Sequence, residues 1–304
     1  MLRSSGRKFL HTAAALAAAI VLWISPAGSA LSLTAMASTY PVTAAAQTIP
    51  DGIAGSTYAI LVNQATGEVV ASKNGEAVIF PASMTKVMTL LVAAEHVTDL
   101  TDTYTITQDI LDYCAAHDCS TVGFAAGETV TVMDLLWGTI LPSGADAAVA
   151  LGRYVAGSDE AFVELMNQKA AELGLTSTHF TNCVGLYDNL HFSSCADIAA
   201  IMNAAAQNTL ALTVLGTRTY TTVPTIYHPN GITVSNLFLS RIDPLDTGGV
   251  VFAAKTGYIN QSRYCAVSYY FSASGTPYIC VTGSASSSMN AVYDHQNIYN
   301  TYAR

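Results

Sequence analysis

The sequence predicts an α+β fold, in which an antiparallel sheet is flanked by helices and accompanied by an all-helical subdomain. Two strand-like runs come early, at Tyr58–Asn63 and Glu68–Ser72. Helical patterns then fill about residues 97–213, and strand-like runs dominate after about Val214. Early and late strands on either side of a helical insertion are typical of an α+β arrangement, and the cleft between its two subdomains is a natural site.

The first 30 residues have the pattern of a signal peptide. Arg3, Arg7 and Lys8 give a positive start, residues 13–24 are an unbroken apolar run, and residues 26–30 are mostly small. Cleavage fits after residue 30 or after residue 37, and the sequence does not choose between them. The apolar run is shorter than the ~20 residues that span a bilayer. We therefore expect an exported, extracytoplasmic protein, secreted or weakly membrane-associated.

The composition fits export and argues against a nucleic-acid partner. Of 304 residues, 51% are hydrophobic and only 11% are charged, so neutral polar side chains must cover much of the surface. The formal net charge is -9, and such an acidic surface repels phosphate backbones. The apolar content is sufficient for a sizeable core.

The six cysteines favour disulfides in an exported chain. Neighbours in sequence suggest the pairs Cys114–Cys119, Cys183–Cys195 and Cys265–Cys280, the last across a predicted hairpin. Buried free thiols are the alternative, because connectivity cannot be deduced from sequence. None of these pairs has zinc-finger spacing.

The elements follow in order after a linker. Residues 31–50 are rich in Ala, Ser and Thr without a period, so we assign 31–52 to a linker and 53–304 to the folded domain. A short Gly-containing loop joins the first two strands as a hairpin. The predicted helices are 132–140, 145–155, 160–173, 195–206 and 290–302, and the predicted later strands are 218–223, 233–238, 250–255, 264–271 and 277–282.

Ser83-Met84-Thr85-Lys86 is the most informative segment, because it opens a predicted helix that runs through residues 87–96. A spacing of three on a helix puts Ser83 and Lys86 on one face, with Cβ atoms roughly 5 to 6 Å apart. A lysine can deprotonate the serine only if desolvation or a nearby cation lowers its pKa. Free N–H groups of the first helical turn can stabilise an oxyanion. Taken alone the tetrapeptide is weak evidence for a catalytic site, since a capping serine with a solvated lysine gives the same pattern.

Two further segments carry matching chemistry. Lys255-Thr256-Gly257 ends a strand-like run, where a cation and a hydroxyl can hold a carboxylate and the glycine admits another chain. Ser143-Gly144-Ala145-Asp146 lies between two predicted helices, where the Ser143 hydroxyl can face the cleft and relay a proton. A strand exit and a helix cap are the structural alternatives.

In this order the three segments resemble the three motifs of the penicillin-binding proteins and serine β-lactamases. Residues 80–86 (FPASMTK), 141–144 (LPSG) and 255–258 (KTGY) are more specifically similar to the low-molecular-mass D-alanyl-D-alanine carboxypeptidases. The similarity covers about residues 58–282. It implies a β-lactamase/transpeptidase-like fold and a serine-type carboxypeptidase that needs no cofactor and no metal.

The resemblance also implies a substrate and roles for the motif residues. Peptidoglycan stem peptides ending in D-alanyl-D-alanine would lose their terminal D-alanine, and β-lactam antibiotics would be covalent inhibitors. Ser83 would form the acyl-enzyme, Lys86 would be the base, and Ser143 would pass the proton to the leaving D-alanine.

The strand that carries the third motif would bind the substrate. By the same resemblance, Lys255 and Thr256 would hold the terminal carboxylate, with Gly257 beside them, and the N–H groups of Ser83 and Tyr258 would form the oxyanion hole. The chain ends 22 residues after Thr282 (304 minus 282), which leaves no room for the extra β-domain and membrane-binding tail of many relatives. Membrane attachment is therefore doubtful.

One departure from the family pattern concerns Ala145, where the second motif usually ends in asparagine. An alanine cannot donate to the substrate amide or contact the lysine, which could cost about 1 to 3 kcal/mol. Turnover should be weakened rather than abolished. A weakly active or non-catalytic muropeptide- or penicillin-binding domain is accordingly one alternative function.

Two other enzyme classes compete with the carboxypeptidase. A serine β-lactamase needs a second base, and the nearest pattern, Glu164 with Asn167, has the wrong spacing and is assigned to helix surface. A zinc peptidase would need paired ligands such as H-E-x-x-H, which the histidines do not form, so His179 and His191 are assigned structural or loop roles.

Overall fold

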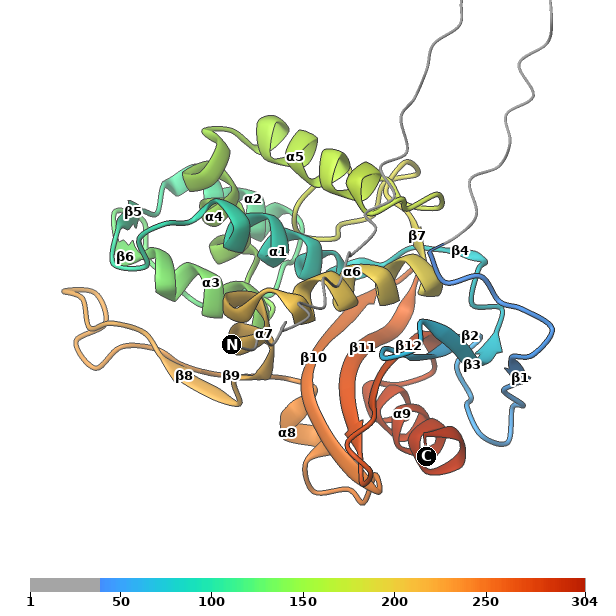
Figure 1. Cartoon of the computed structure of the whole chain (residues 1–304). Helices are drawn as coiled ribbons and strands as arrows, with labels where there is room; N and C mark the ends of the chain where they lie inside the picture. The colour runs from blue at the N-terminus through green and yellow to red at the C-terminus, as the bar shows by residue number, and fades with distance from the viewer. Residues whose placement is uncertain (1–38, 304) are drawn as a thin grey trace, which may run out of the picture. The chain divides into compact units, whose positions relative to one another are not determined.

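A six-stranded sheet forms the centre of the computed structural model, which describes residues 39–303 (Figure 1). These residues belong to the unit Met36–Arg304, and the predicted signal peptide, residues 1–30 or 1–37, lies outside them. The strands are ordered β1-β3-β2-β12-β11-β10, and all neighbours are antiparallel except β1, which runs parallel to β3. Their bounds are β1 Gln47–Thr48, β2 Tyr58–Asn63, β3 Glu68–Lys73, β10 Gly249–Ile259, β11 Arg263–Ser272 and β12 Pro277–Ala285.

The early hairpin joins the late strands directly, because β2 pairs with β12. Ile60 lies opposite Val281, and both are fully buried. Alternate residues of each strand point to opposite faces. On β11, Val267 therefore enters one hydrophobic core and Ala266 enters the other. The sheet is thus buried on both sides, which explains the near-continuous apolar runs of its central strands.

Helices cover both faces of the sheet (Figure 1). Helix α6, Cys195–Gln207, packs on one face against β2, β11 and β12, and its first turn is capped by the Ser194 side chain. Helices α8, Leu239–Ile242, and α9, Ser288–Tyr302, pack on the other face. Two hydrophobic cores result, one between the sheet and the helical subdomain and one beneath α9.

The helical subdomain holds the remaining helices, together with three two-stranded pieces. A 3-10 turn, Ala82–Thr85, leads into α1, which runs through the middle of this layer. Thr131 and Asp134 cap α3 reciprocally, as a Thr/Asp pair at this spacing favours. The helices are α1 Lys86–His96, α2 Gln108–Ala116, α3 Val132–Ile140, α4 Ala145–Ala156, α5 Asp159–Glu172 and α7 Thr209–Gly216; the small strands are β4 Val78–Ile79, β5 Thr103–Thr105, β6 Thr129–Thr131, β7 Ser193–Ser194, β8 Thr219–Thr221 and β9 Thr233–Ser235.

Part of the predicted linker belongs to the fold. Residues 39–52 were expected to lie outside the domain, but Tyr40 and Ile49 are buried in its two cores. The backbone of β1 also pairs with Ala71 and Ser72 at the edge of the sheet. Two apolar side chains in a polar-looking stretch are thus enough to anchor it, and the folded part begins before the predicted start at Ile53.

The predicted disulfides are wrong for this structure, in which all six cysteines are free thiols. Ser268, not Cys265, lies opposite Cys280, and Cys265 sits in a bulge of the ladder with its side chain in the other core. Cys183 points at α4, where its Sγ lies 3.7 Å from the Ala148 carbonyl oxygen. Proximity in sequence therefore did not translate into facing side chains. Cys114 and Cys119 are neighbours in space, with their thiols hydrogen-bonded rather than joined.

Within residues 39–303, no single helix is both long and apolar enough to cross a membrane. Helices α6 and α7 meet that test only as a pair, and a bend of 107° separates them.

Candidate active site

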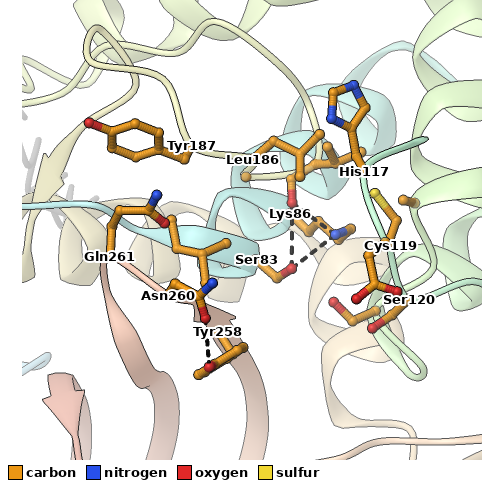
Figure 2. Close-up of a pocket in the computed structure, with 16 residues that line it drawn as sticks. Ser83, Lys86, His117, Cys119, Ser120, Leu186, Tyr187, Tyr258, Asn260 and Gln261 are labelled. Atoms are coloured by element: carbon orange, nitrogen blue, oxygen red, sulfur yellow. Dashed lines mark hydrogen bonds between the residues drawn. The ribbon is translucent and has the colours of Figure 1, made fainter. Parts of the chain in front are cut away.

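Ser83 and Lys86 meet at the N-terminal end of α1 (Figure 2). Ser83 lies in the 3-10 turn, one residue after Ala82, whose φ of 48° is unusual for a residue with a side chain. The Lys86 Nζ atom donates to Ser83 Oγ at 3.0 Å and to the Val184 carbonyl oxygen at 2.8 Å. Ser83 Oγ also donates to that carbonyl at 3.5 Å. The amine is thus in direct contact with the hydroxyl that it would have to deprotonate.

Burial changes the chemistry of the Lys86 amine. The residue is only 2% exposed, and desolvation lowers its pKa from 10.5 to about 8. The nearby thiols and the Asp146 carboxylate act in the opposite direction but do not cancel this effect. A lysine with a pKa near 8 is neutral in a useful fraction of molecules at neutral pH, which is the form that can accept a proton.

Ser143 is held by the second buried lysine. Lys255 Nζ donates to Ser143 Oγ at 2.9 Å and to the Thr256 carbonyl oxygen at 2.7 Å. Burial, and next the charge of Lys86, lower the pKa of Lys255 well below its ordinary value. Ser143 has a φ of 64°, a backbone conformation that costs energy for a residue with a side chain and is concentrated at functional sites.

The third motif lies on β10, an edge strand, beside the turn that carries Ser83. A Cβ atom on Gly257 would stand 3.0 Å from the Ser83 nitrogen and 2.6 Å from the Cys265 sulfur. Glycine is therefore needed for the strand to approach the backbone of Ser83. Tyr258 follows as an exposed residue, with its ring against Tyr264 and its hydroxyl donating to Asn260 at 3.0 Å.

These groups border a cavity of about 410 Å³. Ser83, Lys86, Ser143 and Tyr258 line it, whereas Thr256 and Gly257 line a smaller neighbouring cavity of about 140 Å³ that Tyr258 shares. The buried Lys255 side chain contacts Ser143, which lines the first cavity. Figure 2 shows the rest of the rim, in which His117, Cys119 and Ser120 stand on one side, Leu186 and Tyr187 on another, and Asn260 and Gln261 next to Tyr258.

Position 145 lines the same cavity without adding a polar side chain. Ala145 is 1% exposed, and its nitrogen donates to the Ser120 carbonyl oxygen at 2.8 Å. The neighbouring Asp146 has a structural task. Its buried carboxylate accepts from the nitrogens of Val122 and Gly123, which fixes the loop that carries Ser120. Desolvation nevertheless raises the pKa of Asp146.

Sequence reasoning missed the Val184 carbonyl, which receives hydrogen bonds from both Ser83 and Lys86. Every residue has a main-chain carbonyl oxygen, so no residue type in the sequence marks this one. The signal that could have indicated it is Asn182 followed by Gly185, an amide and a glycine three apart, which is typical of a tight turn.

Two residues from the competing interpretations have structural contacts. Asn167 was assigned to helix surface, but it is half-buried and exchanges two 2.9 Å hydrogen bonds with the backbone of Phe180. His191 is buried, with its Nε2 2.8 Å from the Thr85 hydroxyl and its Nδ1 accepting from the Thr181 nitrogen, so Nε2 carries the proton. Burial lowers the pKa of His191 to about 4. Over the described part of the chain, no group of three or more His, Cys, Asp or Glu side chains is placed to hold a metal ion.

Comparison with known proteins places this geometry in a family. The sequence profile of a family described as D-alanyl-D-alanine carboxypeptidase, peptidase S11, matches residues 43–285. The D-alanyl-D-alanine carboxypeptidase DacF of Bacillus subtilis is 31% identical over 207 residues, which cover 68% of this chain and 52% of that protein. The D-alanyl-D-alanine carboxypeptidase of Streptomyces sp. strain K15 is 32% identical over 213 residues, which cover 68% of this chain and 73% of that protein.

The solved structures agree with the sequence comparison. The crystal structure of the Streptomyces K15 DD-transpeptidase superposes with a TM-score of 0.73 at 28% identity, covering 81% of this chain and 96% of that one. The predicted α+β fold is thereby confirmed, although the sheet is mixed because of β1. The chain spans about half the length of DacF. It belongs to the D-alanyl-D-alanine carboxypeptidase family of serine peptidases, peptidase S11.

Proposed function

We propose that this chain is a serine-type D-Ala-D-Ala carboxypeptidase that removes the terminal D-alanine from peptidoglycan stem peptides through an acyl-enzyme on Ser83. The observation that carries the proposal is the 3.0 Å contact between Ser83 Oγ and the buried Lys86 amine. Family membership supports the substrate class, and the protein would act outside the cytoplasm.

The contacts of the two lysines support the following route for acylation. The neutral Lys86 amine takes the proton of Ser83, and Oγ bonds to the carbonyl carbon of the penultimate D-alanine. The N–H groups of Ser83 and Tyr258 would stabilise the resulting oxyanion. The C–N bond then breaks, and the leaving amine takes a proton through Ser143, whose hydroxyl is hydrogen-bonded to Lys255.

Deacylation uses water and returns the enzyme to its starting state. A water molecule bonds to the acyl carbon, the ester bond to Oγ breaks, and Oγ recovers a proton. The peptide leaves with a new terminal carboxylate. A β-lactam would follow the first half of this route, with its amide C–N bond broken but its amine still attached within the adduct.

The decisive experiment follows D-alanine release from diacetyl-lysyl-D-alanyl-D-alanine by the parent protein and by Ser83→Ala. We expect release only from the parent, with a rate constant for acylation that rises about tenfold per pH unit below pH 8 and levels off above it, since only neutral Lys86 is a base. Equal release from both proteins would refute the mechanism.

Incubation with labelled penicillin separates the remaining functions. A long-lived adduct on Ser83 is the carboxypeptidase result, whereas rapid penicillin hydrolysis would identify a β-lactamase. Peptide binding without either acylation or D-alanine release would identify a non-catalytic binding domain, as the missing amide at Ala145 would favour.

A further inference from the structure

The direction in which the Lys86 amine points depends on one backbone carbonyl. A neutral lysine amine has two N–H donors and one lone pair. In the described structure its hydrogen-bond partners are Ser83 Oγ and the Val184 carbonyl oxygen, at 3.0 and 2.8 Å. Ala145, which lines the same cavity, offers no polar side-chain atom. When an N–H of the amine is given to Val184, the lone pair is left free to face the Ser83 hydroxyl.

The position of that carbonyl is set by the Asn182 side chain. Its Oδ1 atom accepts from three successive backbone nitrogens, those of Val184, Gly185 and Leu186, at 3.2, 2.7 and 3.0 Å. Its Nδ2 atom donates to the Leu186 carbonyl oxygen at 3.1 Å. One amide thus closes the whole turn of residues 182–186.

The turn is also pressed against the nucleophile. Gly185 has a φ of 90°, and a Cβ atom there would stand 1.9 Å from the Ala82 carbonyl oxygen and 2.9 Å from the Ser83 nitrogen. No side chain fits, so the turn and the backbone of Ser83 form one rigid contact. A shift of the turn would therefore be transmitted to both Ser83 and Lys86.

We infer that Asn182 is a positioning residue for acylation, which holds the Val184 carbonyl where it orients the Lys86 amine toward Ser83. The inference rests on the proposed function, in which Lys86 is the base. Loss of the Asn182 amide frees three N–H groups, lets the turn relax and leaves the amine without a fixed direction. Because Asn182 acts through the Val184 carbonyl, the rate of bond formation should fall while the preceding non-covalent binding step is retained.

The test measures stopped-flow acylation by a fluorescent penicillin, which separates the initial binding constant from the rate constant of acylation. For Asn182→Ala we expect the acylation rate constant to fall about 10- to 100-fold, as small misplacements of catalytic groups do, with the binding constant unchanged. Asn182→Asp keeps an acceptor oxygen for the three N–H groups and should stay within about threefold of the parent.

Asn167→Ala is the matched control, because Asn167 makes the same kind of side-chain clamp on the backbone of Phe180, two residues before Asn182. It should lower the melting temperature without changing the acylation rate constant. Parent-like acylation by Asn182→Ala, or an equal loss in the Asn167→Ala control, would overturn the inference.

Two further results keep the outcomes apart. If Asn182→Ala does not fold, the Asn182→Asp and Asn182→Ser variants replace it. The acylation rate constant should then fall in the order parent, Asn182→Asp, Asn182→Ser, and equal rate constants for the Asp and Ser variants would count against the inference. Labelling of Ser83→Ala by the same penicillin would instead refute the proposed function, independently of the results for the Asn182 variants.

Discussion

Replacing Lys86 by methionine should destroy acylation and stabilise the fold at the same time. Lys86 is 2% exposed, and burial holds its pKa at about 8, compared with 10.5 for an ordinary lysine. The folded protein thus releases the proton of Lys86 more readily than the unfolded chain does. Below pH 8 both states are protonated, and the folded state bears the whole cost of a buried charge.

The magnitude follows from the difference between the two pKa values. A difference of about 2.5 units, at 1.36 kcal/mol each, corresponds to about 3 kcal/mol. Methionine has a similar length and no charge to bury, but it leaves the Val184 carbonyl without its donor, which costs about 1 kcal/mol. The net gain at pH 7 is about 2 kcal/mol, or about 5 °C in melting temperature for a domain of this size.

Thermal or urea denaturation of parent and variant at several pH values provides the assay. Between pH 8 and 10.5 the unfolded parent binds more protons than the folded parent, so its stability rises with pH and the advantage of the variant shrinks. Above pH 10.5 the variant should be less stable than the parent, because only the cost of the lost hydrogen bond then remains. A variant less stable than the parent at pH 7, or a difference that does not change with pH, would refute the reasoning.

Two other predictions concern the neighbouring residues Ala145 and Asp146. Ala145→Asn places an amide in the cavity and should raise the acylation rate constant about tenfold, equivalent to ~1.4 kcal/mol, in the same penicillin assay; an unchanged or lower rate would mean that position 145 does not limit acylation. Asp146→Ala leaves the nitrogens of Val122 and Gly123 unpaired and should lower the free energy of unfolding by about 2 kcal/mol in urea titrations, whereas unaltered stability would show that this carboxylate does not hold the loop.

Much of the fold follows from local sequence patterns. Helix α3 occupies residues 132–140 as predicted, because Thr131 and Asp134 form a capping box before an apolar run. The central strands also match, since their apolar side chains are buried on both faces. Short elements were missed, including α8 with four residues and β1 with two, because so few residues show no recognisable hydrophobic period.

The candidate site was likewise predictable from the sequence only in part. The side chains that we propose as catalytic, Ser83, Lys86 and Ser143, could be named from motifs, and the structure brings all three to one cavity. What orients them could not be named. The Val184 carbonyl depends on a backbone turn, and the free cysteines depend on which faces of the sheet and helices meet, so neither is encoded in spacing along the chain.

The pairing of β2 with β12 has a consequence for the order in which the molecule is completed. The segment that carries Ser83 follows the first hairpin, and Lys255 lies on the hairpin of β10 and β11, but only β12 joins these two parts of the sheet. A chain that stops before Pro277 contains Ser83, Lys86, Ser143 and Lys255 but lacks the strand that links the first hairpin to β10 and β11. Isolated two-stranded hairpins are marginal in water. We therefore expect Ser83 and Lys255 to be held in their final places only after the last 28 residues, 277–304, have been added to the chain.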